Sequence, residues 1–297
     1  KGYDTIYGYG RARSYTAIAS YFYLSFNSRG GSAVDGQFVI SGKKAYVPRI
    51  PVKEGYILAG WYKDAAYTDS WSFSSDTVAK DTTLYAKWED WVAQKDELIG
   101  GKLRRTYYLD NGRPDRVVEY FGASASTGVY RIHYYTNGLR TSYKIYNQSG
   151  TLINLIELYE NGNTSKVNYY SASTGKRYAY KLYDTAGRMT TYTYTYGDGV
   201  KPKKTNYYNV STGKRYAYKL YDTAGRTTHY IYTYSDGVKP EKTNYYTAST
   251  GIRKSYKLYD TAGRMTHYAE CYSDGNNAKK MNYYNAATGV RTGYKTY

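Results

Sequence analysis

The sequence contains few of the residues that catalysis, metal binding or disulfide bonding require. Its 297 residues include one cysteine, Cys271, so no intrachain disulfide can form, and only three histidines. His229 and His267 are equivalent positions of successive repeats, which a unique catalytic base would not be, and no Cys/His spacing suits zinc. No apolar run approaches the ~20 residues of a membrane-spanning helix. We expect no catalytic residue, no metal, no cofactor and no transmembrane segment.

Large aliphatic residues are also scarce in the second half, whereas tyrosine is abundant, with 46 residues. A tyrosine hydroxyl needs a hydrogen-bond partner or water, so half-buried aromatic surfaces are expected instead of one dry core. The formal net charge is +18, and nearly all of it lies after residue 100. Such a charge favours an acidic partner, or it keeps an extended sheet soluble and protects its edges. Both interpretations remain open.

Glycine marks a repeat that fills most of the chain. The triplet NYY recurs every 38 residues, and between its copies turn glycines are spaced by 12, 12 and 14. One unit reads NYY, SASTG, KRYAYKLY, DTAG, RMTTYTYTY, GDG, VKPKKT, which predicts three strands and three turns. The NYY triplets begin at Asn168, Asn206, Asn244 and Asn282.

About fifteen strands are expected from residue 107 to the end, joined by short turns that make neighbours antiparallel. The array could be a flat or twisted meander, a wound solenoid or a closed barrel, of which the closed barrel is least expected. The fold class is therefore mainly all-β. Because a unit holds an odd number of strands, consecutive copies of a simple meander run in opposite directions. If equivalent tyrosine rows stack on each other, the array must be wound.

Residues 21–88 differ in composition and contain Trp61, Trp71 and Trp88. Their series LSFNSRGGSAVD, KEGYILAGWYKD, WSF and DTTLYAKW resembles the Listeria–Bacteroides repeat, the internalin B-type repeat of bacterial surface proteins. The resemblance implies a small β-grasp-like module without enzymatic activity, used for adhesion, spacing or partner contact. In a module this small the tryptophans are expected to fill the core.

The remaining segments complete the predicted organisation. Residues 1–20 are expected to be an arm or the end of a preceding module, and residues 89–106 a charged linker. The chain begins and stops in mid-pattern, so we expect a piece of something longer. The segments YDTAGRMTTYTY and YYTNG also resemble YD repeats and MORN-type hairpins of bacterial proteins. The spacing of 38 departs from the shorter YD period, so no toxin-enclosing shell is inferred.

These patterns favour a secreted or cell wall-associated bacterial protein, Gram-positive-like, that adheres through a basic, tyrosine-rich surface. The expected partner is an anionic or neutral polysaccharide of a cell envelope or a host surface. A purely structural stalk and non-specific nucleic-acid binding are the alternatives, and the neighbouring surface-protein module disfavours nucleic acid. In the third copy Lys254 and Glu270 replace tyrosines, so that copy should contribute least. The candidate ligand surface comprises Tyr192, Tyr194, Tyr196, Tyr230, Tyr232, Tyr234, Arg188, Arg226 and Arg264.

Overall fold

The computed structural model describes residues 20–297, so the predicted arm lies almost entirely outside the described residues. The chain divides into two compact units, with the boundary between Trp91 and Val92. Nearly every regular element is a β-strand, the exception being a short 3-10 turn at Ala125–Thr127. The prediction of a mainly all-β chain is confirmed.

The first unit is a four-stranded sheet with the strand order β2-β1-β4-β3. The central strands β1 and β4 run parallel, and each pairs antiparallel with an outer strand. A parallel central pair flanked by antiparallel strands agrees with the expected β-grasp-like module. The four strands are β1 (Tyr21–Asn27), β2 (Gln37–Ile40), β3 (Tyr56–Tyr62) and β4 (Thr82–Asp90).

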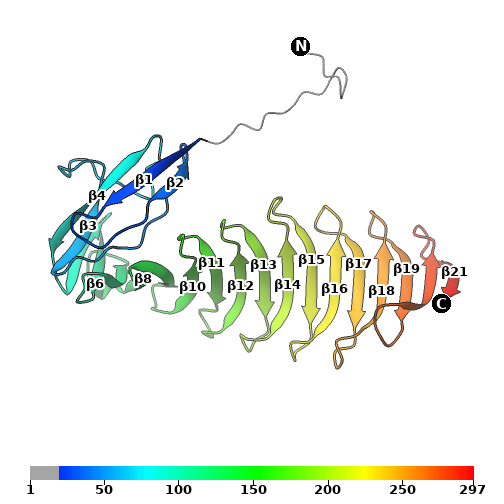
Figure 1. The fold of residues 1–297 in the computed structure, drawn as a ribbon. Coiled ribbons are helices and arrows are strands. Elements are labelled where there is room, and N and C mark those ends of the chain that lie inside the picture. Colours follow the sequence, from blue (N-terminus) through cyan, green and yellow to red (C-terminus); the bar gives the residue numbers. More distant parts are fainter. Residues whose placement is uncertain (1–19) are drawn as a thin grey trace, which may run out of the picture. The chain divides into compact units, whose positions relative to one another are not determined.

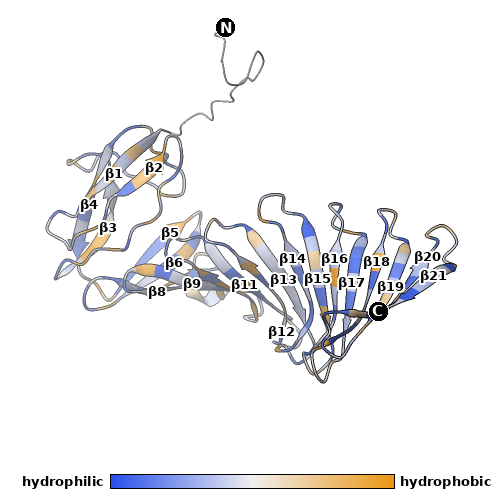
Figure 2. Cartoon of the chain, turned by 45° about the vertical axis from the view of Figure 1, so that its right-hand side comes forward, coloured by the Kyte–Doolittle hydropathy of each residue, from blue (hydrophilic) through white to orange (hydrophobic). Residues whose placement is uncertain are grey.

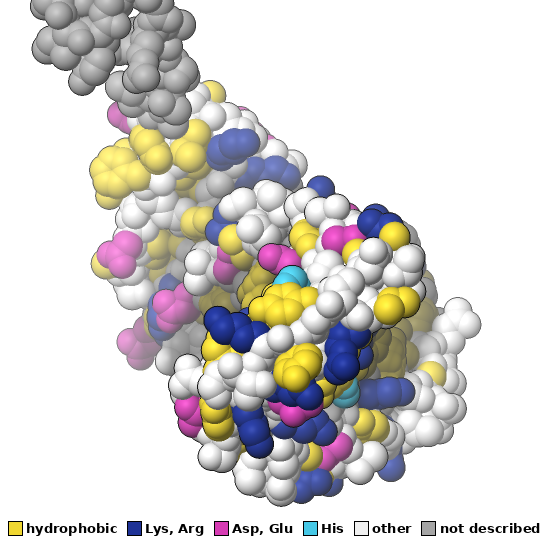
Figure 3. All heavy atoms as spheres, turned by 90° about the vertical axis from the view of Figure 1, so that its right-hand side faces the viewer, with side chains coloured by type: hydrophobic (Ala, Val, Ile, Leu, Met, Phe, Trp, Pro, Cys, Tyr) yellow, Lys and Arg dark blue, Asp and Glu magenta, His cyan; other side chains and the backbone are white. Residues whose placement is uncertain are grey.

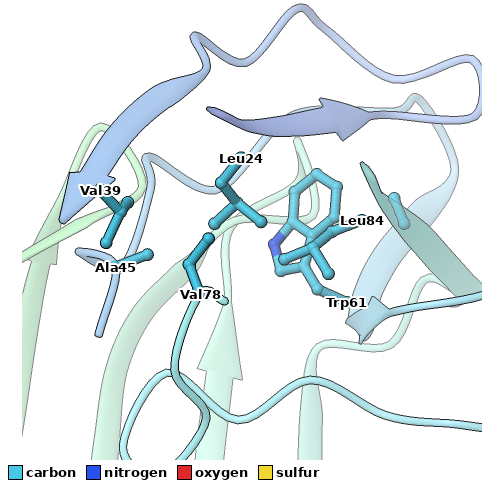
Figure 4. Packing of buried hydrophobic residues seen from close by; sticks show 7 residues of the cluster. Leu24, Val39, Ala45, Trp61, Val78 and Leu84 are labelled. Atoms are coloured by element: carbon cyan, nitrogen blue, oxygen red, sulfur yellow. The ribbon is translucent and has the colours of Figure 1, made fainter. Parts of the chain in front are cut away.

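One face of this sheet carries the core of the first unit. Leu24, Val78 and Leu84 are fully buried there and pack with Trp61 (Figure 4). The partly buried Trp88 packs on the same cluster, and its indole N–H donates to the carbonyl of Ser28 at 2.9 Å. The expected core-filling role of the tryptophans is confirmed.

The second unit is a single sheet of 17 strands that follow one another in sequence order (Figure 1). Each strand pairs antiparallel with its sequence neighbours, as the ladder from β12 to β13 to β14 illustrates. No ladder joins the end strands β5 and β21 among the described residues, and Figure 2 labels these strands at opposite ends of the row. The predicted elongated antiparallel repeat array is confirmed as a meander.

The strand bounds show how closely the array follows the repeat. From β10 onward almost every strand has seven residues. The strands are β5 (Gln94–Ile99), β6 (Lys102–Tyr108), β7 (Pro114–Tyr120), β8 (Val129–Thr136), β9 (Leu139–Tyr146), β10 (Leu152–Leu158), β11 (Thr164–Tyr170), β12 (Arg177–Tyr183), β13 (Met189–Thr195), β14 (Pro202–Tyr208), β15 (Arg215–Tyr221), β16 (Thr227–Thr233), β17 (Pro240–Tyr246), β18 (Arg253–Tyr259), β19 (Met265–Cys271), β20 (Ala278–Tyr284) and β21 (Arg291–Thr296).

The segment expected as a linker instead begins the array. Residues 89–106 contain the end of β4, the whole of β5 and most of β6. Gly100 and Gly101 both have positive φ, 57° and 75°, which suits the two central residues of a tight hairpin turn. Across this hairpin the Arg105 guanidinium donates to both carboxylate oxygens of Asp96 at 2.7 Å. The charged residues of 89–106 therefore include partners that pair across the first hairpin of the array, and they do not mark a linker.

The repeat array is a single sheet, and from residue 165 onward nearly all of its buried residues are small or polar, with Ile231 the exception. Ala179 and Ala217 are completely buried, and Thr193 and Asn206 are almost completely buried. A small cluster of buried hydrophobic residues around Leu103 occurs at the start of the array, and no such cluster occurs among the described residues of 165–297. The strands of the array are accordingly coloured mainly blue and white in Figure 2. From β12 onward both faces of the sheet carry mainly tyrosine, threonine and basic side chains.

Candidate functional site

The arginines expected to bind ligand belong to the DTAGR turns. Asp184 accepts the backbone N–H groups of Ala186 and Arg188 through Oδ1, at 3.0 and 2.9 Å. Its Oδ2 lies 2.8 Å from both Nε and a terminal nitrogen of Arg188. These hydrogen bonds, the backbone N–H of Arg188 first, hold the pKa of Asp184 below its usual value. The same geometry recurs at Asp222 with Arg226 and at Asp260 with Arg264.

Tyrosine side chains gather in groups that span three strands. Tyr192 and Tyr194 follow each other along one face of β13, with ring centroids 4.5 Å apart. Tyr169 of β11 lies 6.3 Å from Tyr192 and 6.2 Å from Tyr178, which sits in a bulge of β12. We call Tyr169, Tyr178, Tyr192 and Tyr194 cluster 1. These rings surround the fully buried Ala179.

The next copy builds the same group. Tyr230 and Tyr232 have ring centroids 4.6 Å apart, and Tyr207 lies 6.0 Å from Tyr230 and 6.3 Å from Tyr216. Tyr207, Tyr216, Tyr230 and Tyr232 form cluster 2, around the fully buried Ala217.

The two clusters lie on opposite faces of the sheet. Directly paired residues of antiparallel strands share a face, and successive residues of a strand alternate between faces. Tyr192 pairs with Asn206, Asn206 with Tyr218, and Tyr218 with Ile231. Ile231 therefore shares the face of Tyr192, and its neighbour Tyr230 points to the other face. The structure brings together the tyrosines within each copy but does not join copies into one row.

Tyr196 and Tyr234 do not continue the rows, which corrects the prediction from alternation. Strand β13 ends at Thr195, and the pairing register shifts between Tyr194 and Thr195. The residue left unpaired by this shift is Lys203 on β14, and Tyr196 lies just beyond β13 at the start of the turn, where its hydroxyl donates to the carbonyl of Tyr221 at 2.6 Å. Tyr234 makes the equivalent hydrogen bond to Tyr259. Both residues clamp hairpins together.

Lysines lie over the tyrosine rings of both clusters. Lys181 Nζ is 5.0 Å from the ring centroid of Tyr192, and Lys219 Nζ is 4.9 Å from that of Tyr230. An exposed cation–π contact contributes roughly 0.5–1 kcal/mol. Figure 3 shows Lys and Arg side chains lying between yellow side chains on the face that it displays. Sequence analysis missed these lysines, although each one occurs in the recurring YKLY segment.

The asparagine of NYY also acquires a role that the sequence did not reveal. Asn206 is 5% exposed, accepts a hydrogen bond from the Arg215 guanidinium at 3.2 Å and donates to the carbonyl of Tyr192 at 3.5 Å. Asn168 with Arg177 and Asn244 with Arg253 repeat the contact. In the sequence, the unchanged recurrence of NYY was the signal for this buried, hydrogen-bonded asparagine.

Burial raises the pKa of tyrosines in both clusters. It raises the pKa of Tyr230 to about 12, with the hydroxyl of Tyr232 adding to the effect, and it also raises the pKa of Tyr192. These hydroxyls are therefore neutral hydrogen-bonding groups at physiological pH. Within the part of the chain that the structure describes, no group of three or more His, Cys, Asp or Glu residues could hold a metal ion.

A hollow occupies the third-copy position. Its cavity volume is about 430 Å³, and it opens on the face that carries cluster 1, because Ile231 pairs with Thr243, Thr243 with Lys257, and Lys257 with Tyr268. The residues that line the hollow are Tyr245, Ser255, Lys257, Met265, Tyr268 and Tyr284.

Comparison with known proteins bears on the first unit. The family model of the Listeria-Bacteroides repeat domain matches residues 22–87. This segment is a Listeria-Bacteroides repeat domain. The predicted limits of 21–88 differ from the match by one residue at each end. For residues 20–297, no helix is long and apolar enough to cross a membrane.

Two proteins of Evansella cellulosilytica are similar to the same segment. One, named as a Gly-rich membrane protein, is 47% identical over 66 residues, and another, named as a membrane protein, is 44% identical over 66 residues. Each match covers 22% of this chain but only 8% and 10% of the respective relative. The chain therefore spans a small part of the length of these relatives.

Similar solved structures are distant. TarM of S. aureus, solved with fondaparinux, alpha-GlcNAc-glycerol and UDP, is 11% identical, with 32% of this chain and 18% of that chain covered and a TM-score of 0.27. The accessory secretory protein 1, 2 and 3 structure of Streptococcus pneumoniae is 11% identical, covering 42% and 21%, with a TM-score of 0.23. Scores this low support no statement about the fold or function of this chain.

Proposed function

We propose that the chain is part of a non-enzymatic bacterial surface protein whose repeat array binds polysaccharide through its tyrosine clusters. The Listeria-Bacteroides repeat domain and the membrane-protein names of the relatives support an extracellular or wall-associated location. The proposed partner is an anionic or neutral polysaccharide of a cell envelope or of a host surface. Adhesion is the role that follows from such binding.

The observation that carries this proposal is the partial exposure of tyrosine rings beside lysines. Tyr178 and Tyr216 are 48% and 46% exposed, and in each of their clusters a lysine lies over another tyrosine ring. The apolar face of a sugar ring packs on an exposed aromatic ring, whose hydroxyl remains free to hydrogen-bond. The adjacent ammonium groups attract carboxylate, sulfate or phosphate groups of an anionic polymer.

Alternation of faces sets the spacing of these clusters. Clusters on the same face are six strands apart, which at about 4.8 Å per strand is roughly 29 Å. A polymer lying along one face therefore meets a cluster at long intervals, and a second polymer can lie on the other face. Tight overall binding would come from several weak contacts on one chain.

Salt dependence tests the ligand class. The 297-residue chain is titrated with polygalacturonate, with dextran and with single-stranded DNA, first at roughly 0.05 M and then at about 0.5 M salt. The proposal expects binding to at least one of the two polysaccharides that exceeds binding to the DNA at both salt concentrations. Stronger DNA binding would favour the nucleic-acid alternative, and binding to none of the three would favour the stalk.

Cluster variants test the surface. Tyr178→Ala and Tyr216→Ala each remove one exposed ring from one face, so each should weaken polysaccharide binding several-fold. Their effects should add in the double variant, because the two sites share no contacts. Tyr46→Ala is the matched control, since Tyr46 is 51% exposed but lies in the first unit. Equal binding of all four proteins would contradict a cluster site.

A further inference from the structure

The third copy departs from the first two at three positions that the fold brings together. Lys254 stands where clusters 1 and 2 have Tyr178 and Tyr216, and Glu270 stands where they have Tyr194 and Tyr232. Ser255 replaces the buried alanine. Ser255 pairs directly with Glu270 on β19 and with Tyr245 on β17, and Lys254 precedes it in the same bulge of β18. The three changes therefore alter one place on one face.

These changes account for the hollow. In cluster 2 the Tyr232 ring covers Tyr230 at a centroid distance of 4.6 Å. Glu270 is exposed and has no ring, so the equivalent Tyr268 and its neighbour Tyr245 line an open cavity of about 430 Å³. Two aromatic rings remain where clusters 1 and 2 have four. In the third copy, a cavity bordered by polar side chains therefore replaces the cluster of four packed tyrosine rings.

The polar groups of the cavity are free to meet a ligand. Ser255 is 6% exposed and lines the cavity, and its hydroxyl has no hydrogen-bond partner within residues 20–297. Lys257 also lines the cavity, with its ammonium 5.6 Å from the ring centroid of Tyr245. This hydroxyl is open to the cavity, so it can hydrogen-bond to water there or to a ligand that takes the place of that water.

We propose that this cavity, which we call the third-copy pocket, binds one neutral sugar ring of the hexopyranose type. This inference deepens the proposed polysaccharide binding by naming a discrete site for it. Tyr245 and Tyr268 offer apolar faces for the C–H side of the ring, and Ser255 and Lys257 offer hydrogen bonds to its hydroxyls. The volume lies at the small end of the ~300–1,000 Å³ of small-molecule sites, which suits one ring and not a long segment.

Glu270 does not line the pocket itself but pairs directly with Ser255, which does, and its carboxylate beside the pocket favours a neutral ring. A carboxylate accepts hydrogen bonds from sugar hydroxyls, and such charge-assisted bonds are shorter and stronger than neutral ones. An acidic sugar would instead bring its own carboxylate close to that of Glu270. Binding in the third-copy pocket should therefore depend little on salt, unlike the binding of an anionic polymer by the lysines of the two clusters.

The repeat supplies matched variants in both directions. Lys254→Tyr, Ser255→Ala and Glu270→Tyr together give the third copy the side chains of cluster 2, which fills the pocket. Tyr216→Lys, Ala217→Ser and Tyr232→Glu together give cluster 2 the side chains of the third copy, which opens a second pocket. Thermal unfolding of both triple variants verifies that the array is intact.

The experiment is a calorimetric and saturation-transfer NMR titration of the whole chain with methyl β-glucopyranoside, methyl β-galactopyranoside, N-acetylglucosamine and glucuronic acid. We expect the wild type to bind at least one of the three neutral sugars at one site. The filled variant should bind that sugar at least tenfold more weakly, a loss of about 1.4 kcal/mol, and the opened variant should bind it at two sites.

Three outcomes would overturn the inference. These are no saturable binding of any neutral sugar to the wild type, unchanged binding by the filled variant, and a preference for glucuronic acid that disappears with salt. Polysaccharide binding by the filled variant separates the two proposals. If the filled variant still binds polymer, the clusters act without the pocket. If the wild type binds the single sugar but binds no polysaccharide, the pocket stands and the cluster proposal fails.

Discussion

The hydroxyl of Tyr196 donates a hydrogen bond to the carbonyl of Tyr221, two strands further along the sheet. Tyr159 makes the same kind of bond to Tyr183, and Tyr234 to Tyr259. Each bond links the end of one hairpin to the end of the next on the same edge. Without these tyrosine hydrogen bonds, only the hydrogen bonds between paired strands would connect the hairpin ends.

Tyr196→Phe should therefore destabilise the array without affecting ligand binding. The phenylalanine keeps the ring but leaves the carbonyl of Tyr221 without its donor. A net loss of about 0.5–1.5 kcal/mol is expected for one hydrogen bond. Urea unfolding followed by circular dichroism measures it. Tyr178→Phe is the control, because the Tyr178 hydroxyl makes no hydrogen bond within the described residues, and a similar loss in that control would contradict the role of the clamp.

Replacement of Asn206 should lower the free energy of unfolding more than Tyr196→Phe does. Its side chain is buried and satisfies both the Arg215 guanidinium and the carbonyl of Tyr192. Asn206→Ala removes the acceptor of Arg215 Nη1 and a donor to the Tyr192 carbonyl, while Arg215 Nε keeps its hydrogen bond to the carbonyl of Gly237. The free energy of unfolding should therefore fall by roughly 1–3 kcal/mol. Chemical denaturation is again the measurement. The exposed Asn276→Ala, in the turn between β19 and β20, is the control, and a loss for Asn206→Ala no larger than for this control would contradict the assignment.

Acid should destabilise the array through the DTAGR turns. The folded pKa values of Asp184, Asp222 and Asp260 are lowered, chiefly by the backbone N–H of the arginine four residues later. Their stabilising contribution is therefore present above the unfolded value of about 3.9 and is lost as the pH falls through the lowered folded values. Melting temperatures between roughly pH 5 and pH 2 measure this fall.

The triple replacement of these three aspartates by asparagine should flatten that fall. The exposed Glu241→Gln serves as the control, since Glu241 makes no ion pair within the described residues. A fall of equal size and midpoint in the triple variant and the wild type would show that the turns do not carry the acid sensitivity.

Alkali should loosen the tyrosine clusters. Burial raises the pKa of Tyr230 to about 12, so the neutral phenol is favoured in the folded state. Its contribution is fully present below the unfolded value of about 10 and is lost as the pH rises toward about 12. In Tyr230→Phe the melting temperature should fall less through this range, and the tyrosinate absorbance gained near pH 12 should be smaller by the contribution of one residue. A variant that matches the wild type in both readouts would refute this assignment.

The strands of the array could be predicted from the sequence because each turn needs a residue that tolerates positive φ. Gly199, for example, has a φ of 76°, and its loop presses so closely on β12 that an added Cβ would lie 3.1 Å from the carbonyl oxygen of Arg177. The hairpin at Gly100 and Gly101 carries the same signal, but charged residues around it indicated a linker. Composition misled there because an end strand tolerates charges on both faces.

The position of the tyrosines was predictable only within single strands. Period two correctly groups Tyr192 with Tyr194, yet it does not extend to Tyr196, because β13 ends at Thr195 and Tyr196 begins the turn. Which face a copy occupies depends on the register across several bulges, and no local pattern gives that register. Lys254 and Glu270 were visible as departures from the repeat, but their convergence with Ser255 on one cavity required the fold.

The three-strand unit has a consequence for how such an array can change in length. Loss or duplication of one 38-residue copy preserves every kind of strand pairing, because the copies are equivalent. It nevertheless moves all later clusters to the opposite face and makes the last strand end at the opposite edge. Two copies gained or lost together restore both. Strand pairing therefore tolerates any number of copies. A partner that binds one face, in contrast, requires copies to be gained or lost in pairs.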